Sequence, residues 1–512
     1  MQGKINMKQT LVCAVCAAVA LSAVAGQKKY IAFGWEFQRL TPKQILANAD
    51  KFRGTALDGI GLYPCATNSL GKELKYVSAG EKWEREAFRD QLDDYRKIVR
   101  TPHLSESFFV GLGAPVKRLK WTDDAGWANL ANSMSVLGWL MRETGVKGME
   151  CDVEDYHQQK QFNQLPDDPA WDELLPLVRR RGRELFGAFF KEKPDARVLF
   201  YFLMNMNRDY FTTPDPAENV RFLKDLTPAF VDGILDVMPE TARLLNGDEH
   251  TYWASALRRD FQKSYMNQRL INPLLVSPEN RDKYRRLTQA SFAIYLDMYV
   301  NDEKNVWYFG PVDGSRTECL RRNLFAATRT ADEYVWLWGE KHRTIDWEDA
   351  TIAPRVRGKG TWADNLPGLN EAMLCCKDAD WGLKRRVEAL RSRGELVNLC
   401  TNASPVTITS GESCRMLTIE PVKVGDTFAV FGAMRGEADA SAAFGTKDGW
   451  VRSREPVRFL PGAADADGWR PFSGIVVVPA DVTQAVVLFD APGKKKDAKT
   501  YGMKDLRVYR LW

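Results

Sequence analysis

The sequence predicts a (β/α)8 barrel, an α/β fold, followed by a C-terminal all-β sandwich. Short apolar segments alternate eight times with amphipathic helical patterns across about three hundred residues. Polar residues, several of them acidic, follow these apolar segments at their carboxyl ends. From about residue 399 onward the helical patterns stop, and strand patterns separated by Gly, Asp and Pro turns run to the end of the sequence.

The predicted strands of the barrel are apolar runs rich in β-branched and aromatic residues. They span 30–37, 57–64, 108–115, 148–156, 198–205, 243–253, 306–311 and 335–340. Apolar residues at helical spacing, such as Trp127 and Met134, predict helices between the strands. A further helix, before the seventh strand, is predicted from Leu287, Phe292, Tyr295 and Tyr299. Phe230–Val237 is an alternative strand in this region.

The first 26 residues are predicted to be an export signal and not part of the fold. Lys4 and Lys8 precede an apolar run that ends in Ala-Val-Ala at 23–25, the small-residue pattern of a signal-peptidase site. The run is too short to span a membrane comfortably, and no later stretch is long and apolar enough. We expect export to the periplasm, the cell surface or the medium. The expected domains are a barrel at 27–365, closing helices at 366–398 and a sandwich at 399–512.

Composition and motifs argue against several classes of protein. The 72 Lys and Arg residues are interspersed with 67 Asp and Glu residues, so no basic patch indicates a nucleic-acid partner. The sequence lacks GxGxxG after a strand, GxxxxGK[ST] and GxSxG, which disfavours nucleotide chemistry and serine hydrolases, and we expect no cofactor. A metal held by His157, His250 and nearby acids is an alternative. Because no two of these residues have ligand spacing on one element, we predict no metal.

The segment 145–157 contains the most informative pattern in the chain. In an extended strand, Glu150, Asp152 and Glu154 point to one face, while the apolar residues between them point to the other. Three carboxylates on one face repel one another, which suits a hydrated edge strand. This strand, however, lies between two amphipathic helices, the setting of an interior strand that carries few charges. We therefore interpret the acids as functional.

In a (β/α)8 barrel, the carboxyl ends of the strands meet at one mouth, where catalytic residues lie. The predicted catalytic residues are Asp152, Glu154, Glu249 and Glu340. The predicted substrate-binding residues are Glu36, Trp35, Tyr63, Asn205, His250, Tyr252 and Trp338. Glycosidic cleavage fits this set, because it needs one acid to protonate the leaving oxygen and a second carboxylate as nucleophile or base. The aromatic residues suit stacking on sugar rings.

The segment 147–154, KGMECDVE, resembles the fourth strand of chitinase-type glycoside hydrolases, whose motif is DGxDxDxE. The last Asp and the Glu match, whereas Lys147 and Glu150 replace the first two Asp residues. This resemblance implies Glu154 as general acid, Asp152 as its partner, and Trp338 as the tryptophan of the last strand. A second resemblance, to barrel α-galactosidases and related retaining enzymes, implies Asp152 as nucleophile and Glu249 as acid.

The C-terminal segments FSGIVVVPADVTQAVVLF and DLRVYRLW resemble strands of jelly-roll carbohydrate-binding modules. The resemblance implies sugar contacts at Trp450 and Trp469, and a sandwich that only supports the barrel is the alternative. Together these observations predict an exported glycoside hydrolase that acts on a polysaccharide or host glycan. Because Lys147 departs from the motif, a non-catalytic glycan-binding protein on a degenerate barrel is the alternative.

Overall fold

The computed structural model describes residues 28–74, 76–113, 117–154, 160–204, 215–312, 314–348, 355–400, 405–451, 456–479, 481–494 and 499–511. These residues form two compact units, which divide between Asp378 and Ala379. The predicted export signal lies outside the described residues. No helix within the described ranges has the length and apolar character needed to cross a membrane.

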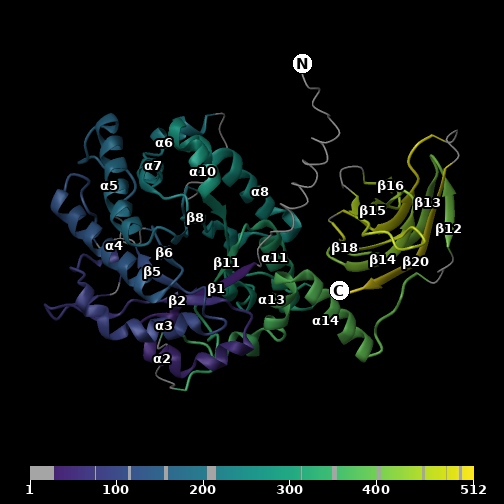
Figure 1. Ribbon diagram of the computed structural model, residues 1–512, viewed down its shortest axis with the longest axis horizontal. Coiled ribbons are helices and arrows are strands. Elements are labelled where there is room, and N and C mark those ends of the chain that lie inside the picture. The colour runs from purple at the N-terminus through teal and green to yellow at the C-terminus, as the bar shows by residue number, and fades with distance from the viewer. Residues whose placement is uncertain are drawn as a thin grey trace, which may run out of the picture. The chain divides into compact units, whose positions relative to one another are not determined.

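The first unit contains a barrel-like sheet of parallel strands, several of which are labelled in Figure 1. Its strands are β1 (Lys29–Gly34), β2 (Gly59–Leu62), β5 (Phe108–Leu112), β6 (Gly148–Cys151), β7 (Arg197–Phe200), β8 (Arg243–Asn246), β9 (Thr288–Ala290), β10 (Phe292–Tyr295) and β11 (Tyr334–Gly339). They follow the order β10-β11-β1-β2-β5-β6-β7-β8-β9, and all neighbouring pairs are parallel. The predicted barrel class is therefore confirmed.

Ser291, the single residue between β9 and β10, closes the barrel. Its N–H donates a 2.9 Å hydrogen bond to the carbonyl oxygen of Asn246 on β8. Its hydroxyl donates a 2.8 Å bond to the carbonyl oxygen of Tyr334 on β11. β9 and β10 thus form one continuous span at the seventh strand position of the barrel. The nine strands of the sheet therefore fill eight positions.

The prediction of the seventh strand was wrong. Residues 306–311 form no strand, and the seventh position is occupied by β9 and β10. Leu287 ends α10, and Phe292 and Tyr295 belong to β10, so the predicted helix is not formed there. This strand is buried on both faces, and a short apolar run of that kind has no period that separates strand from helix. The alternative strand at 230–237 is instead part of the helix α7.

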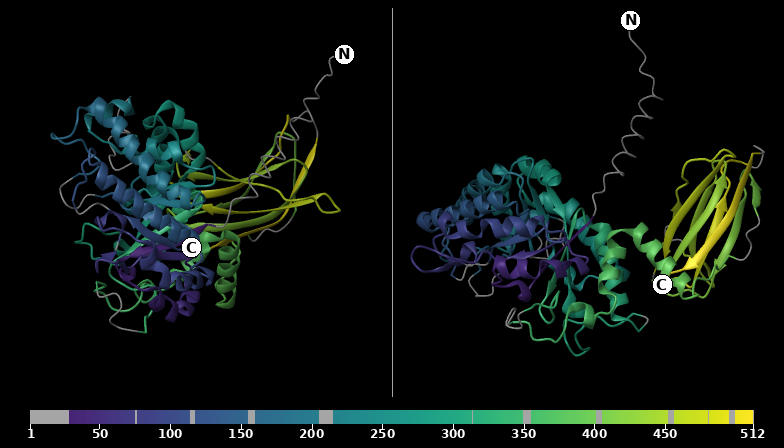
Figure 2. Two further views of the ribbon diagram at one scale, coloured as in Figure 1. Left: turned by 60° about the vertical axis from the view of Figure 1, so that its left-hand side comes forward. Right: turned by 60° about the horizontal axis from the view of Figure 1, so that its bottom comes forward.

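Helices surround the strands of this unit (Figures 1 and 2). The α-helices are α2 (Pro42–Ala47), α3 (Leu92–Arg100), α4 (Asp124–Thr144), α5 (Trp171–Glu192), α6 (Pro216–Phe222), α7 (Thr227–Val237), α8 (Asp260–Met266), α9 (Asn272–Leu275), α10 (Arg281–Leu287), α11 (Arg316–Thr330), α12 (Trp362–Asn365) and α13 (Leu369–Lys377). Short 3-10 or π segments are η1 (Trp35–Phe37), η2 (Ala49–Gly54), η3 (Val77–Ala79), η4 (Arg85–Gln91), η6 (Glu249–Trp253), η7 (Ala256–Arg258), η8 (Asn267–Ile271), η9 (Pro278–Asn280) and η10 (Leu296–Tyr299). β3 (Ala66–Thr67) and β4 (Glu73–Leu74) form a small hairpin.

Local sequence signals position the helix before β6. The side chain of Asp123 accepts a 2.9 Å hydrogen bond from the N–H of Gly126, which caps the first turn of α4. Gly145, with a φ of 81°, ends α4 in the left-handed conformation that glycine adopts without steric cost. These two residues set where the chain turns back toward β6, the strand that carries the acidic residues.

Helices α5 and α7 pack in close contact because two glycines meet at their crossing. A methyl group at Gly182 would lie 2.3 Å from the carbonyl oxygen of Phe230. A methyl group at Gly233 would lie 2.1 Å from the carbonyl oxygen of Arg179. Any larger side chain at either glycine would therefore force the helices apart.

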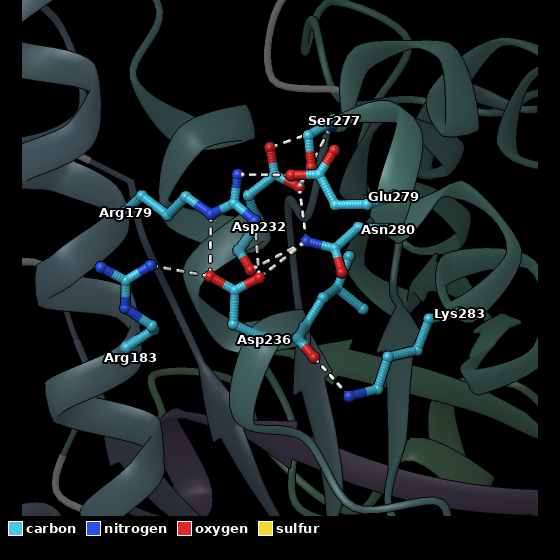
Figure 3. A network of polar contacts seen from close by, with 9 residues as sticks. Arg179, Arg183, Asp232, Asp236, Ser277, Glu279, Asn280 and Lys283 are labelled. Carbon is cyan, nitrogen blue, oxygen red and sulfur yellow. Dashed lines mark hydrogen bonds and ion pairs between the residues drawn. The ribbon is translucent and has the colours of Figure 1, made fainter.

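A polar network beside this crossing joins α5, α7 and the segment before α10 (Figure 3). Arg179 donates two hydrogen bonds to Asp236, at 2.7 and 2.8 Å, and Arg183 donates a third at 3.0 Å. The Nδ2 of Asn280 donates to both Asp232 and Asp236. Burial opposes ionisation of Asp236, but these hydrogen bonds outweigh it and lower its pKa to about 2. The network therefore ties α5 and α7 to η9, the segment before α10.

The second unit begins with α14 (Ala379–Ser392) and continues as two antiparallel sheets. One sheet has the order β12-β20-β14-β18, and the other has the order β13-β19-β15-β16 with β17 paired to β15. Their strands are β12 (Val406–Thr409), β13 (Ser413–Ile419), β14 (Thr427–Arg435), β15 (Asp439–Thr446), β16 (Gly449–Trp450), β17 (Val457–Phe459), β18 (Trp469–Val477), β19 (Gln484–Asp490) and β20 (Thr500–Arg510). Buried residues from both sheets, including Phe428 and Phe489, form one core. The predicted all-β class of this region is confirmed.

Candidate active site

The acidic residues of the fourth strand lie at the carboxyl end of β6. Glu150 is inside β6 and only 2% exposed, and Asp152 follows the last residue of the strand. The N–H of Asp152 donates a 2.8 Å hydrogen bond to the carbonyl oxygen of Leu112 on β5. The Oδ1 of Asp152 in turn accepts a 2.9 Å bond from the N–H of Glu154. This turn holds Asp152 and Glu154 at the mouth of the barrel.

Glu249 lies at the mouth of the barrel as well, just after the end of β8. Asp248 has a φ of 39°, and this left-handed turn starts η6 directly after the strand. The N–H of Glu249 donates a 3.0 Å hydrogen bond to the carbonyl oxygen of Tyr201, which follows β7. The Ser264 hydroxyl donates to Asp248 and fixes the turn from behind. The Oε2 of Glu249 is buried and has no hydrogen-bond partner in the described part of the chain.

Glu249 is electrostatically close to the other three predicted catalytic acids. Burial, followed by the charges of Glu154, Asp152 and Glu340, raises the pKa of Glu249 to about 9. Burial and the charge of Glu154 raise the pKa of Asp152 to about 7, against a hydrogen bond that lowers it. Burial and the charges of Asp152 and Glu249 also raise the pKa of Glu150 well above its ordinary value. Part of the group therefore carries protons at neutral pH, which provides an acid beside a carboxylate.

Glu340 follows β11 and is held from two sides. Its Oε1 accepts a 3.0 Å hydrogen bond from the indole Nε1 of Trp338. Its N–H donates a 2.9 Å bond to Oδ2 of Asp297, which lies in η10 and is 1% exposed. Burial raises the pKa of Asp297 to about 7, although the hydrogen bond from Glu340 opposes this rise. Burial, Asp297 and Glu340 likewise raise the pKa of Tyr295, at the end of β10, above its ordinary range.

Tyr295 and Asp297 were missed by the sequence analysis, because that region was predicted to be helical. The signal was present in SFAIYLD, an apolar run ended by a tyrosine and an acid. The same pattern, a polar residue that ends an apolar run, predicts Tyr63 and Asp152 as site residues at other strands. The sequence places Glu150 on the acidic strand but does not indicate a specific role for it in the site.

Three aromatic residues form a floor beneath the acids, called here the aromatic floor. The rings of Tyr201 and Trp336 are stacked, with centroids 4.1 Å apart and planes 3° apart. Phe33 meets both of them edge-on, at 5.9 and 6.2 Å. The Nε1 of Trp336 donates a 2.9 Å hydrogen bond to the carbonyl oxygen of Gly247. The predicted ligand Trp338 lies edge-on to Tyr201 at 6.1 Å, so it borders this floor.

Tyr63 and Trp35 lie at one side of the mouth. Burial and the charge of Glu150 raise the pKa of Tyr63 above its ordinary range, whereas a hydrogen bond with Gln38 opposes this rise. The guanidinium of Arg355 donates to Gln38 and lies 4.6 Å from the ring centroid of Trp35. This cation–π contact occupies one face of the half-buried Trp35 ring.

Glu36 has a different environment from the other predicted acids. Its two carboxylate oxygens accept hydrogen bonds from the N–H of Thr344 at 2.8 and 2.7 Å. Oε1 also accepts a 2.7 Å bond from the indole Nε1 of Trp347. Burial nevertheless raises its pKa to about 7. Glu36 thus joins η1 to the loop after β11. Both of its carboxylate oxygens accept hydrogen bonds from that loop, whereas a residue that binds substrate would have oxygens available for it.

The remaining predicted ligands have distinct positions. His250 lies edge-on to Phe202 at 4.9 Å, and Tyr252, 6% exposed, packs 5.5 Å from Trp336. Asn205, predicted as a substrate ligand, and His157, the alternative metal ligand, lie outside the described residues. Within the ranges that the structure describes, no group of three or more His, Cys, Asp or Glu side chains could hold a metal ion.

The two tryptophans of the second unit that the sequence pointed to are both near cations. Trp450 is 45% exposed, and the guanidinium of Arg415 lies 5.4 Å from its ring centroid. Trp469 is half-buried, with the Lys504 ammonium 4.4 Å from its ring centroid. Each ring thus has one face near a charged side chain.

No protein-family model and no curated protein matches the sequence. Similar solved structures include a GH18 chitinase from Pseudoalteromonas aurantia, at 12% identity over 61% of this chain and 94% of that chain, with a TM-score of 0.31. An exo-β-1,4-mannosidase from Opitutaceae bacterium strain TAV5 is similar at 12% identity over 70% of this chain and 60% of that chain, with a TM-score of 0.36.

A D-allulose 3-epimerase from Methylomonas sp. is similar at 12% identity over 70% of this chain and 98% of that chain, with a TM-score of 0.32. These structures include two sugar hydrolases and one sugar epimerase. Because all three TM-scores lie below 0.5, the similarities carry no argument about the reaction.

Proposed function

We propose that this protein is a glycoside hydrolase that cleaves O-glycosidic bonds of a polysaccharide or glycan at the mouth of its barrel. The observation that carries the proposal is the position of Glu249, whose carboxyl group is affected by the charges of Asp152, Glu154 and Glu340 at the carboxyl ends of the neighbouring strands. Glycoside hydrolysis requires two carboxyl groups in different protonation states. A protein that only binds sugars gains nothing from holding several acids together against their repulsion.

Glu249 is the proposed general acid, and Asp152 is the proposed nucleophile or base. The raised pKa of Glu249, about 9, supports a protonated side chain at neutral pH. Asp152, with a pKa of about 7, ionises at lower pH than Glu249. This assignment agrees with the roles that the α-galactosidase-type resemblance implies. Under the chitinase-type resemblance, Glu154 would be the acid instead.

A substrate screen tests the proposal. The purified protein and the variants Asp152→Asn, Glu154→Gln and Glu249→Gln are assayed on polysaccharides, oligosaccharides and aryl glycosides. We expect turnover by the unmodified protein that collapses in Asp152→Asn and Glu249→Gln. Collapse in Glu154→Gln with an active Glu249→Gln would move the acid role to Glu154.

Two other results would contradict the proposal. Binding of a glycan without turnover in any form would support the non-catalytic sugar-binding barrel. Turnover that a chelator abolishes and a divalent metal restores would support metal-dependent hydrolysis instead.

We also propose that the N-terminal segment directs export, so that the enzyme meets its substrate outside the cytoplasm. The charged start, the apolar run and the Ala-Val-Ala pattern at 23–25 support this. Mass spectrometry of the protein from cell fractions should find a mature chain that begins at Gly26 or Gln27. A full-length chain confined to the cytoplasm would contradict export.

A further inference from the structure

Four aromatic rings lead from the acids toward the surface, and they are called here the aromatic row. Its members are Tyr252, Trp253, Tyr295 and Trp307. The rings of Trp253 and Trp307 are stacked, with centroids 4.7 Å apart and planes 28° apart. Tyr295 lies edge-on to Trp307 at 5.5 Å, and the Tyr252 ring lies 5.0 Å from that of Tyr295. The aromatic row thus links η6, after β8, to the end of β10 and the loop beyond it.

The outer end of the aromatic row is exposed and held in place. Trp307 is 37% exposed, whereas Tyr252 is 6% exposed. The Nδ2 of Asn301 donates a 2.6 Å hydrogen bond to the carbonyl oxygen of Trp307. The N–H of Trp307 donates a 2.9 Å bond to Oδ1 of Asn305. The loop backbone is therefore fixed on both sides of a large ring that water still reaches.

The inner end of the aromatic row reaches the proposed catalytic acids. Tyr295 interacts with Glu340, Asp297 and Glu249, and these neighbours together with burial raise its pKa. Tyr252 packs against Trp336 of the aromatic floor. The exposed Trp307 ring therefore contacts Tyr295, and Tyr295 in turn interacts with the acids.

We propose that Trp307, backed by Trp253, is a subsite that stacks on a sugar ring beyond the residue whose bond is cleaved. Aromatic faces suit the apolar C–H face of a sugar ring, while its hydroxyl groups remain in water. The substrate is then an oligosaccharide or polysaccharide chain, and not an isolated monosaccharide glycoside. This inference rests on the proposed function, because the acids define where cleavage occurs.

Binding and turnover measured separately test the subsite. The probes are cello-, manno-, xylo- and N-acetylchito-oligosaccharides of two to six units, together with the matching 4-nitrophenyl monosaccharides. Calorimetric titration gives Kd, and initial rates give kcat and KM. The variants are Trp307→Ala, Trp307→Phe as the conservative change, and Val306→Ala as a control, because Val306 is 75% exposed beside Trp307. Circular dichroism establishes that each variant is folded.

We expect Trp307→Ala to weaken binding of the accepted oligosaccharides roughly 2- to 10-fold, the change that a single ring contact of about 0.5–1.5 kcal/mol produces. The loss should appear in KM and Kd with kcat unchanged, and it should be absent for the 4-nitrophenyl monosaccharide. Trp307→Phe should restore most of the affinity, and Val306→Ala should equal the unmodified protein.

The possible failures are distinguishable. Equal effects of Trp307→Ala on the monosaccharide and on the longer chains, or no effect on either, would overturn the subsite while leaving the hydrolase in place. The absence of binding to every oligosaccharide would overturn the subsite as well. Trp307-dependent binding without any turnover would support the subsite and contradict the proposed hydrolase.

Discussion

The indole Nε1 of Trp338 donates a 3.0 Å hydrogen bond to Oε1 of Glu340, two residues further along the same strand end. In an extended chain, side chains two residues apart point to the same face, so the spacing of Trp338 and Glu340 brings them into contact. The N–H of Glu340 is bonded to Asp297 at the same time. Glu340 is therefore positioned by its own strand and by the neighbouring η10.

Removal of the Trp338 hydrogen bond should lower activity while leaving the fold intact. Trp338→Phe keeps an aromatic ring but has no donor, so the Glu340 carboxylate loses one fixed partner. We expect kcat/KM on the accepted glycan to fall roughly 10- to 150-fold, because a hydrogen bond to a charged group contributes about 1.5–3 kcal/mol and each 1.4 kcal/mol is about tenfold. Trp171→Phe, at the start of α5, is the matched control. Equal activity of both variants would show that the bond has no catalytic role.

Glu249→Gln should affect substrates according to their leaving groups. Glutamine cannot protonate the leaving oxygen, and a positioned acid contributes about 10²- to 10⁴-fold to such a step. We expect that loss for an oligosaccharide and a much smaller one for a 2,4-dinitrophenyl glycoside, whose leaving group needs no proton. Glu173→Gln, an exposed change on α5, should be silent. The same loss for both leaving groups would assign Glu249 another role.

The charge of Glu340 should raise the pKa of the proposed general acid, Glu249. Glu340 is one of the groups that raise the pKa of Glu249. A neutral glutamine at this position removes that repulsion, so the pKa of Glu249 should fall. The alkaline limb of the kcat/KM profile should move to lower pH in Glu340→Gln, by roughly half a unit to one unit. A limb that stays in place or moves upward would contradict Glu249 as the titrating acid.

Asp297 should make the barrel less stable as the pH rises. Its folded-state pKa is about 7, above the value of roughly 3.9 in an unfolded chain, so the native state binds the extra proton between these values. The contribution of Asp297 to the free energy of unfolding, about 1–4 kcal/mol, is complete below about pH 4 and is lost as the pH rises through 7.

The variant Asp297→Asn should therefore show a smaller loss of unfolding free energy between about pH 5 and about pH 8 than the unmodified protein. Urea denaturation at the two pH values measures it. Asp282→Asn is the control, because the Asp282 side chain is 91% exposed. A parallel fall for Asp297→Asn and the unmodified protein would show that Asp297 is not the group responsible.

A buried ion pair should hold the loop that follows the acidic strand. Arg118 donates two hydrogen bonds to Asp168, at 3.0 and 2.7 Å, and the two side chains are 6% and 4% exposed. Arg118→Met leaves the Asp168 charge buried without this partner and should destabilise the protein by about 3–5 kcal/mol.

The double variant Arg118→Met with Asp168→Leu tests the cause of that loss. It removes both charges, so it should recover part of the stability in thermal unfolding. A double variant that is less stable than Arg118→Met would show that the pair contributes more than the penalty of one isolated charge.

The acids at the mouth could be predicted from the sequence for a simple reason. Parallel strands of a barrel bring their carboxyl ends to one side, so Asp152, Glu249 and Glu340 were expected together before any packing was known. Tyr295 and Asp297 could not be predicted in the same way. Tyr295 ends β10 and Asp297 follows it in η10. The strand is apolar on both faces, and its residues fit helical spacing as well as strand spacing.

The amino-acid sequence by itself determined the class of fold and the chemical groups at the strand ends. Only the tertiary structure decided what surrounds each group. Glu36 and Glu249 both follow a strand, yet Glu36 accepts hydrogen bonds from Thr344 and Trp347, whereas Glu249 faces other carboxyl groups with Oε2 unpartnered among the described residues. The protonation of a carboxyl group depends on burial and on nearby charges, and residues far apart in the chain supply both.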